Sequence, residues 1–264
     1  MKFALVNGER QEAQPNLSGN CPACEQAMIA KCGEVKIRHW AHKGRRTCDP
    51  WWENETEWHR AWKGQFPDDW QEFRHRAENG ETHIADVKTA RDWVIEFQHS
   101  YIKPEERRSR DSFYPKLVWV VNGVRRKRDR AQFLNAWNEG VPVDANRRVR
   151  RAFAHECVLI REWAGSHAAI FFDFGEEQVL WWLLSTSLGG PTYVEQFPRS
   201  DFIKIHRDGV IKSAHDFDEL VKVRTTFVSD CESLLAQELR RASLPPLRGF
   251  QQHLDRVGKL RRRF

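Results

Sequence analysis

The sequence predicts an α/β protein: a mixed sheet flanked by helices, preceded by a small N-terminal module and followed by an α+β C-terminal domain. Helix-like and strand-like patterns alternate between residues 51 and 140, which indicates the central fold. Residues 1–50 are rich in turn residues, cysteine and histidine, and they are too few to own a large core. Residues 141–264 combine apolar strand-like runs with a long helical pattern, which predicts the α+β domain.

The composition is that of an ordinary globular protein with a basic balance. Hydrophobic residues make up 40% of the chain and charged residues 30%, which excludes a disordered protein. The formal net charge of +6 favours an anionic partner, and clustering of the basic residues favours it further. The clusters are Arg125–Arg128, Arg147–Arg151 and Arg261–Arg263. We therefore favour nucleic acid as the partner, over the alternative that these clusters are solvated faces.

Residues 1–10 lack an apolar signal core, and the chain has no run of 18 apolar residues. We therefore expect a cytoplasmic protein without a membrane segment. In that compartment, the Cys-x-x-Cys pair among the six cysteines indicates metal binding or redox chemistry rather than a disulfide framework.

The N-terminal module contains a candidate zinc site. A Cys-x-x-Cys pair is followed, after 14 residues, by a His-x-x-His pair. Two thiolates and two imidazoles suit tetrahedral Zn²⁺, and four protein ligands indicate a structural role. The candidate ligands are Cys21, Cys24, His39 and His42. Because the histidine gap is short, Cys32 or Cys48 is an alternative to one histidine, and packed histidines beside free cysteines are the alternative without metal.

The central fold is predicted to begin with a helix over residues 53–65, where tryptophans recur at helical spacing and Asn54 or Thr56 is the cap. Glu78-Asn79-Gly80 predicts a hairpin turn, and Pro104 suits the first turn of a later helix. The further elements expected, in order, are strands over 70–76, 82–88 and 93–98, a helix over 104–114, a strand over 116–121 and a helix over 129–138.

The flanking regions are less regular. In the N-terminal module we expect short strands over 28–31 and 35–37. In the C-terminal domain we expect a hairpin of strands over 168–174 and 178–184, a strand over 202–206 and a mainly helical segment over 213–241.

A row of polar side chains marks the candidate site. Alternate residues of a strand share a face, so Glu96, Gln98 and Ser100 point the same way while Ile95 and Phe97 point the other. A polar row in an otherwise apolar strand is costly when it is merely buried, so it indicates a site.

Asp86 lies on the preceding strand and can converge with Glu96 on one hard cation. Mg²⁺ takes one or two carboxylates with water and substrate phosphate, and such a metal activates water and neutralises a scissile phosphate. The amide of Gln98 would orient the water or the phosphate. The alternative is a surface hairpin with ordinary charges, since two carboxylates ten residues apart are common.

The motif extends in both directions. Upstream, a Glu-Thr-x-x-His-x-x-x-Lys motif over residues 55–63 places three polar side chains on one helical face. Downstream, an Arg-x-x-x-Tyr motif over 110–114 precedes the apolar segment 117–123. With Asp86 and the Ile-Glu-Phe-Gln-x-Ser segment over 95–100, these motifs resemble the competence protein CoiA-like family of bacterial nucleases. The Cys-Pro-x-Cys and His-x-Ala-His segments resemble the same family, and Phe171-Phe172-Asp173-Phe174 matches it loosely.

The resemblance implies a PD-(D/E)XK nuclease core and a role in DNA uptake, recombination or defence. It implies that Asp86 and Glu96 bind Mg²⁺ or Mn²⁺, and that Gln98 stands where the parent motif has lysine. It places Glu55 and His59 beside the site and Lys63 at the phosphate. The catalytic candidates are Glu55, His59, Lys63, Asp86, Glu96 and Gln98.

The chain departs from the pattern at two positions. His83 stands where relatives are expected to carry arginine. The neutral amide of Gln98 cannot supply the charge of a lysine, so the site either relies on Lys63 or Lys88, works more slowly, or is inactive.

The sequence therefore predicts a DNA nuclease, with single-stranded, duplex and branched DNA all open as substrates. The rival hypothesis is a nucleic-acid-binding module with a degenerate site. Only the nuclease hypothesis predicts that Asp86, Glu96 and Gln98 converge on a cation. A zinc-dependent redox protein is disfavoured, because the Cys-x-x-Cys pair lies in a turn region and not before a βαβ helix.

Overall fold

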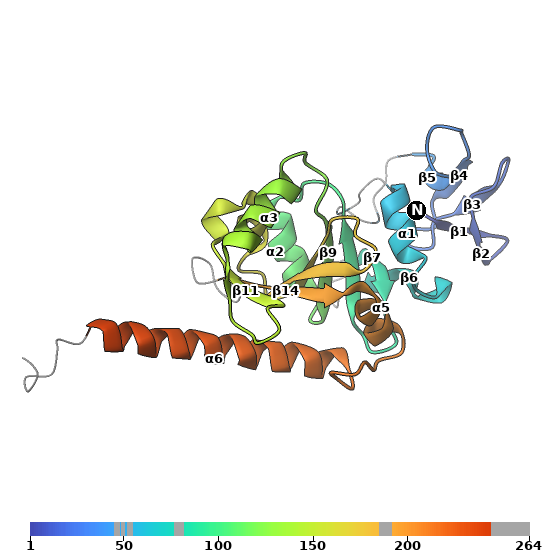
Figure 1. The fold of residues 1–264 in the computed structure, drawn as a ribbon. Helices are drawn as coiled ribbons and strands as arrows, with labels where there is room; N and C mark the ends of the chain where they lie inside the picture. The colour runs from blue at the N-terminus through green and yellow to red at the C-terminus, as the bar shows by residue number, and fades with distance from the viewer. Residues whose placement is uncertain (45–47, 49–50, 52–54, 77–81, 185–191, 244–264) are drawn as a thin grey trace, which may run out of the picture. The chain divides into compact units, whose positions relative to one another are not determined.

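The computed structural model describes residues 1–44, 48, 51, 55–76, 82–184 and 192–243 (Figure 1). The chain divides into a compact unit of Met1–Arg224 and a second unit of Thr225–Phe264. The first unit contains two sheets with helices around them, so the mixed α/β class predicted from the sequence is confirmed. The predicted turn at 78–80, the cap Asn54 and the basic cluster at 261–263 lie outside the described residues.

A small antiparallel sheet forms the N-terminal module. In the described residues its strands are β1 (Phe3–Val6), β2 (Glu9–Glu12), β3 (Ser18–Asn20), β4 (Ala27–Lys31) and β5 (His39–His42), in the order β2-β1-β3-β4-β5. Asn7 and Gly8 both have positive φ, as a tight two-residue hairpin requires. The strand predicted over 28–31 is confirmed as β4. The strand predicted over 35–37 is wrong: Val35 is 96% exposed, and the next strand begins at His39.

A larger mixed sheet forms the centre of the first unit. Within the described residues its order is β10-β11-β14-β13-β12-β9-β8-β7-β6. The strands are β6 (Gln71–Arg76), β7 (Thr82–Lys88), β8 (Val94–Gln98), β9 (Leu117–Asn122), β10 (Val141–Pro142), β11 (Val149–Ala152), β12 (Ala169–Asp173), β13 (Val179–Leu183) and β14 (Thr192–Pro198). β9 pairs in parallel with β8 and β12, and the other pairs are antiparallel. Strands from both sides of residue 140, where the sequence suggests a domain boundary, thus belong to one sheet.

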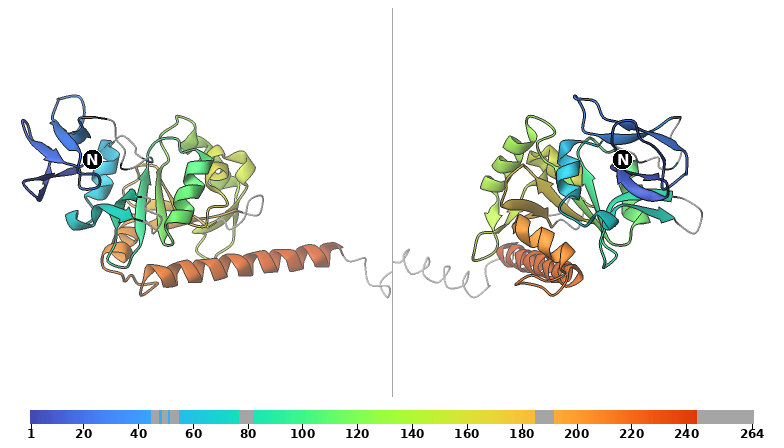
Figure 2. Two further views of the ribbon diagram at one scale, coloured as in Figure 1. Left: turned by 180° about the vertical axis from the view of Figure 1, so that it is seen from behind. Right: turned by 90° about the vertical axis from the view of Figure 1, so that its right-hand side faces the viewer.

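Helices cover both faces of the larger sheet (Figure 2). The helices of the first unit are α1 (Glu57–Lys63), α2 (Pro104–Phe113), α3 (Asp129–Glu139), α4 (Val158–Trp163) and α5 (Arg199–Arg207). Alternation along β9 and β12 sends Trp119 and Phe172 into a core with α3 and α4. On the other face, Trp62 of α1 stacks on Phe97, and Phe202 of α5 contacts Phe171.

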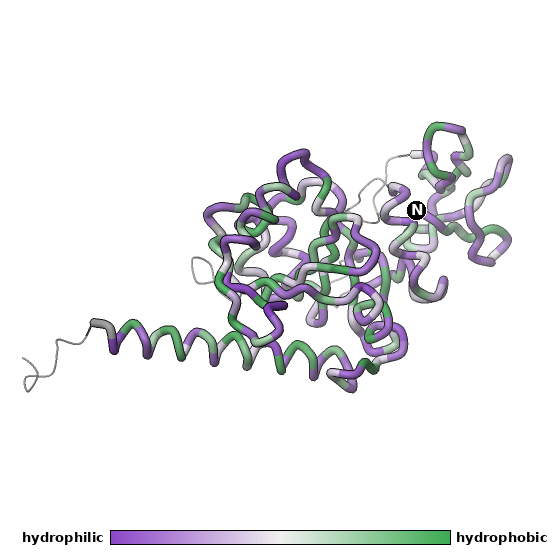
Figure 3. Tube along the Cα trace, in the orientation of Figure 1, coloured by the Kyte–Doolittle hydropathy of each residue, from purple (hydrophilic) through white to green (hydrophobic). Residues whose placement is uncertain are grey.

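One C-terminal element differs from its prediction. The strand predicted over 202–206 is wrong, because this segment lies inside α5. Phe202, Ile205 and His206 are all buried, and their spacing of three and four residues is that of one helical face. The helix predicted over 213–241 is observed as α6 (Phe217–Ser243), along which hydrophobic residues recur between polar ones (Figure 3). Among the helices of the described residues, none combines the length and the apolar character that crossing a membrane requires.

Candidate metal centre and carboxylate cluster

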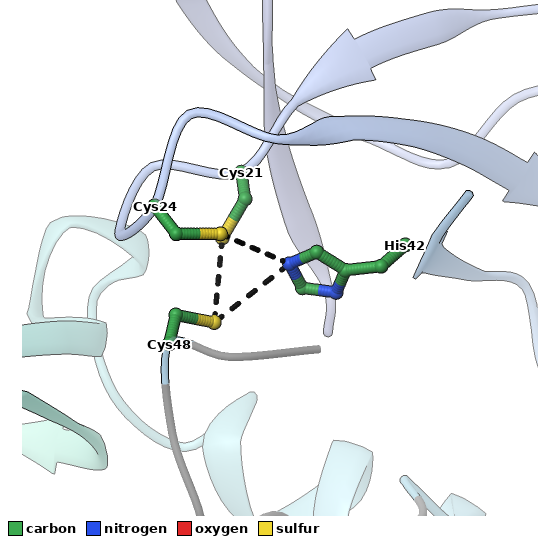
Figure 4. A group of neighbouring side chains, drawn as sticks. All are labelled: Cys21, Cys24, His42 and Cys48. Atoms are coloured by element: carbon green, nitrogen blue, oxygen red, sulfur yellow. Dashed lines mark hydrogen bonds between the residues drawn. The ribbon is translucent and has the colours of Figure 1, made fainter. Parts of the chain in front are cut away.

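Four metal-ligating side chains converge in the N-terminal module (Figure 4). Cys21 follows β3 directly, and Cys24 lies in the turn before β4, where Glu25 takes a positive φ of 61° and its N–H donates to the Cys21 carbonyl. His42 ends β5, and Cys48 lies further along the chain. In the part of the chain that the structure describes, this is the one group of three or more such residues able to share an ion.

The distances in this cluster fit zinc. The Sγ atoms of Cys21 and Cys48 are 3.8 Å apart, and His42 Nε2 lies 3.4 Å from Cys24 Sγ and 3.7 Å from Cys48 Sγ. Tetrahedral zinc with bonds of about 2.3 Å to sulfur and about 2.0–2.1 Å to nitrogen separates two sulfurs by about 3.8 Å and sulfur from nitrogen by about 3.5–3.6 Å. A hydrogen bond from Cys48 lowers the pKa of the Cys21 thiol to about 7 against the effect of burial, which favours the thiolate that a metal binds. The cluster can therefore hold a zinc ion.

The predicted ligand set needs one correction. His39 is not in the cluster, and its Nδ1 lies 2.8 Å from the carbonyl oxygen of Ile37. His39 and His42 stand three apart in one strand, so they point to opposite faces and cannot both reach one ion. Cys48, one of the two cysteines kept as alternatives from the sequence, takes the fourth position, whereas Cys32 does not.

A second cluster gathers carboxylates around Lys63 at the end of α1. Its Nζ lies 3.2 Å from Glu55 Oε1, 3.2 Å from Glu72 Oε1 and 3.3 Å from Asp86 Oδ1. Burial alone would lower the pKa of Lys63, but the carboxylates outweigh it and raise this pKa above its usual range. Burial would raise the pKa of Glu55, yet Lys63, the α-amino group and Arg60 lower it to about 2. Lys63 and Glu55 are therefore held in their charged forms.

An interruption of the sheet places Asp86 at this cluster. Gln71 pairs with Val87 and Phe73 with Ala85, which leaves Glu72 and Asp86 opposite each other between these two pairs. Glu72 has a φ of 49°, a conformation that non-glycine residues adopt at a cost, as at functional sites. Asp86 Oδ2 accepts the backbone N–H of Phe97 at 3.0 Å, taking the position that a strand carbonyl would otherwise have. The Asp86 carboxylate thus lies against β8.

Glu96 and Gln98 face α2, on the side of the sheet opposite to α1. Their strand positions pair with Trp119 and Val121 of β9, whose side chains lie on the face that α2 covers. Glu96 Oε2 accepts from Arg110 of α2 at 3.2 Å, and Gln98 Nε2 donates to the Ser100 carbonyl at 3.2 Å. The structure therefore brings Asp86 together with Glu55 and Lys63, and Glu96 together with Arg110.

The residues around His59 complete this region. Thr56 caps α1, as expected: its hydroxyl accepts the His59 N–H, and its Oγ1 lies 2.9 Å from His59 Nδ1. The ring of His59 lies 5.8 Å from the ring of His99, which follows β8. Glu72 could not be predicted as a site residue, because nothing in its strand-like segment distinguishes it from a surface glutamate.

Replacing Lys63 with methionine should make the protein less stable by about 3–5 kcal/mol at pH 7, because three carboxylates then lose their buried cation. In the wild type, the lowered pKa of Glu55 contributes stability above its unfolded value of about 4.3, and this stability is lost as the pH falls toward about 2. Urea unfolding of both proteins between pH 7 and pH 3 measures the effect. Stability of the Lys63→Met protein should fall less on acidification, and parallel pH curves for the two proteins would contradict the assignment.

The two basic clusters of the described residues are partly engaged within the fold. Arg126 donates to Asp129 and Glu162, and Arg125 also pairs with Glu162. Arg150 donates to the carbonyls that end α3, at Trp137 and Asn138. The exposed basic residues in and beside these two clusters are Lys127, Arg128, Arg130, Arg147 and Arg148, of which Arg130 pairs with Glu176.

Comparison with known proteins identifies the N-terminal module. Residues 10–50 match the family model described as competence protein CoiA, N-terminal domain. This range contains the whole Cys21, Cys24, His42 and Cys48 cluster. Neither the curated proteins nor the solved structures contain a match to the chain.

Proposed function

We propose that this chain is a CoiA-like, metal-dependent nuclease that cuts DNA in a competence-related process, because residues 10–50 match the N-terminal domain of competence protein CoiA. One observation carries the proposal. The carboxylate of Asp86 binds the backbone N–H of Phe97, which lies between Glu96 and Gln98. Three polar side chains of the predicted motif therefore occupy one short stretch of β7 and β8.

The order of the elements supports a PD-(D/E)XK core. From α1 through β6, β7 and β8 to α2 and β9, the chain runs helix, three strands, helix, strand. This is the order that the resemblance to the family implies. Asp86 and the Glu96-x-Gln98 motif stand on the second and third of these strands, where such a core carries its carboxylates.

The chemistry of the motif suits a hard divalent cation, although Asp86 pairs with Lys63 and Glu96 pairs with Arg110 in this structure. Asp86 and Glu96 would hold Mg²⁺ or Mn²⁺, which prefer carboxylate oxygens, and the metal would supply an activated water and charge neutralisation at the phosphate. Lys63 and Arg110 offset the charges of these two carboxylates. Lys63 and Arg110 would contact phosphate oxygens if Asp86 and Glu96 held the metal. Gln98 would orient the water or the phosphate through its amide.

A second candidate function is a DNA-binding module without catalysis. The observation that favours it is that both carboxylates already have cationic partners, Lys63 and Arg110, and that Gln98 bonds to the Ser100 carbonyl. In such a module these interactions would be permanent. Both functions require a basic surface, so only a cleavage assay separates them.

The test is an incubation of the zinc-loaded protein with end-labelled single-stranded, duplex and branched DNA, with Mg²⁺, with Mn²⁺ or with EDTA. Cleavage of any one form that depends on the metal and is absent from the Asp86→Asn protein supports the nuclease. Binding without cleavage of every form, under both metals, supports the binding module instead.

The exposed arginines should carry part of the DNA affinity. Arg147 and Arg148 lie exposed beside β11, whereas Arg150 is engaged with α3. The Arg147→Gln/Arg148→Gln protein should show a flatter dependence of affinity on salt, by roughly 0.7–0.9 log units per tenfold salt for each phosphate that is no longer neutralised. Fluorescence anisotropy at several salt concentrations measures this slope. An unchanged slope would make this cluster a solvated face, and the Lys127→Gln/Arg128→Gln protein provides the same measurement at the other cluster.

A further inference from the structure

A buried carboxylate at the end of β12 holds α1 against the sheet. Asp173 is 2% exposed, yet it accepts hydrogen bonds from two indoles on successive turns of α1. Trp58 Nε1 donates to its Oδ2 at 2.9 Å and Trp62 Nε1 donates to the same atom at 2.8 Å. The two tryptophans stand four apart, on one face of the helix. One oxygen atom therefore accepts hydrogen bonds from both indoles, which restrains rotation of α1 and its movement along its axis.

The other oxygen of Asp173 ties this arrangement to the rest of the fold. Oδ1 accepts the Gly175 N–H at 2.9 Å and Arg199 Nη1 at 3.0 Å. Arg199 begins α5, and its guanidinium also lies 4.0 Å from the ring centre of Trp62. Asp173 thus joins β12, α1 and α5, and its charge is compensated where it is buried.

α1 needs such an anchor. It has seven residues, and a helix of that length has little stability of its own. The two residues of α1 that belong to the proposed site, His59 and Lys63, each follow an anchored tryptophan by one position. The Nζ atom of Lys63 lies 3.3 Å from Oδ1 of Asp86. A rotation or shift of the helix at Trp62 would therefore move Lys63 away from Asp86.

We infer that Asp173 is a positioning residue of the proposed nuclease, which keeps His59 and Lys63 in place through the indoles of Trp58 and Trp62. The inference rests on the proposed function for its catalytic consequence, and on the hydrogen bonds above for its structural one. It assigns a role to a strand far along the chain from the motif, because Asp173 stands 77 positions after Glu96.

The experiment compares Asp173→Asn with a Trp58→Phe/Trp62→Phe protein, which removes both donors but leaves the Arg199 pair. The matched control is Glu195→Gln: Glu195 is also a buried strand carboxylate, and it accepts from Arg224 at 2.6 and 2.8 Å. Hydrogen exchange of the α1 amides is measured in each protein at a temperature where all are folded, together with kcat, KM and DNA affinity.

We expect exchange in α1 to rise about tenfold or more in both test proteins and to stay unchanged in Glu195→Gln. We expect kcat to fall about 10- to 100-fold in the test proteins, with KM and DNA affinity within about twofold of the wild type. The inference is overturned if α1 exchanges at the wild-type rate in Asp173→Asn, or if Glu195→Gln lowers kcat equally. If the wild type cuts no DNA with either metal, the proposed nuclease fails, and the exchange rates alone decide whether Asp173 holds α1.

Discussion

Asp86→Asn is expected to lower the rate of metal-dependent DNA cleavage by more than about 100-fold. Loss of a residue that only supports a metal ligand typically lowers activity by about 10- to 100-fold, so the loss of a ligand itself should cost more. The asparagine keeps an oxygen that can accept the Phe97 N–H, so the junction of β7 and β8 should survive while the charge that binds the metal is lost. Glu96→Gln should have the same effect, because it removes the other proposed ligand. DNA affinity should hold or increase in both proteins, since a carboxylate no longer repels phosphate.

The neighbouring positions should follow a graded order. Gln98→Ala should cost less than either carboxylate, because it removes orientation and not the metal. His59→Ala should fall between them, since α1 borders the site, and Gln98→Lys should retain or raise the activity. The matched control is Asp92→Asn, an exposed carboxylate after β7 whose salt bridge with Lys88 is 3.0 Å long. Single-turnover cleavage at one metal concentration orders these proteins, and wild-type rates for the Asp86 and Glu96 variants would assign the activity to another site or protein.

Removal of the metal from the Cys21, Cys24, His42 and Cys48 cluster is expected to unfold the N-terminal module. Structural zinc in small domains contributes an apparent free energy of roughly 10–16 kcal/mol, more than a small sheet of short strands supplies by burial. The purified protein should contain one zinc per chain, and chelation should remove the hydrogen-exchange protection of residues 1–44 while the larger sheet keeps its own.

The choice between His39 and Cys48 is decided by two substitutions. Cys48→Ser should lose zinc and stability, whereas His39→Ala should keep both, because His39 lies on the other face of β5. Cys32→Ser is the matched cysteine control, since Cys32 lies outside the cluster. Elemental analysis of each protein provides the measurement. Absence of zinc from the wild type, or zinc retained by Cys48→Ser and lost by His39→Ala, would contradict this assignment.

Local patterns are sufficient to predict the strands and helices between residues 55 and 139. The alternation of side chains in β7 and β8 and the capping of α1 by Thr56 depend only on neighbouring residues, so they can be predicted from the sequence. α5 differs from its prediction because its apolar residues form a short run that suits a strand as well as a helix.

The interactions of the site depend on residues distant in sequence, and they could not be predicted. Glu72 meets Lys63 only because β6 is irregular opposite Asp86, and Asp173 meets Trp58 only because β12 pairs with β9. The error at His39 was avoidable, since a strand over His39–His42 already separates the two histidines by face. No feature of the neighbouring sequence indicates that Cys48, and not Cys32, belongs to the metal cluster.

The parallel pairing of β9 with β12 has a consequence for truncated versions of this protein. All residues of β9 are buried, and each residue from Val118 to Asn122 has a register partner on β12. A fragment ending near residue 140 would expose that strand as a long apolar edge with unpaired N–H and C=O groups, a template for aggregation. The segment with the nuclease-like motif therefore depends on strands supplied after residue 140, and parallel pairing across so much chain also makes its folding slow.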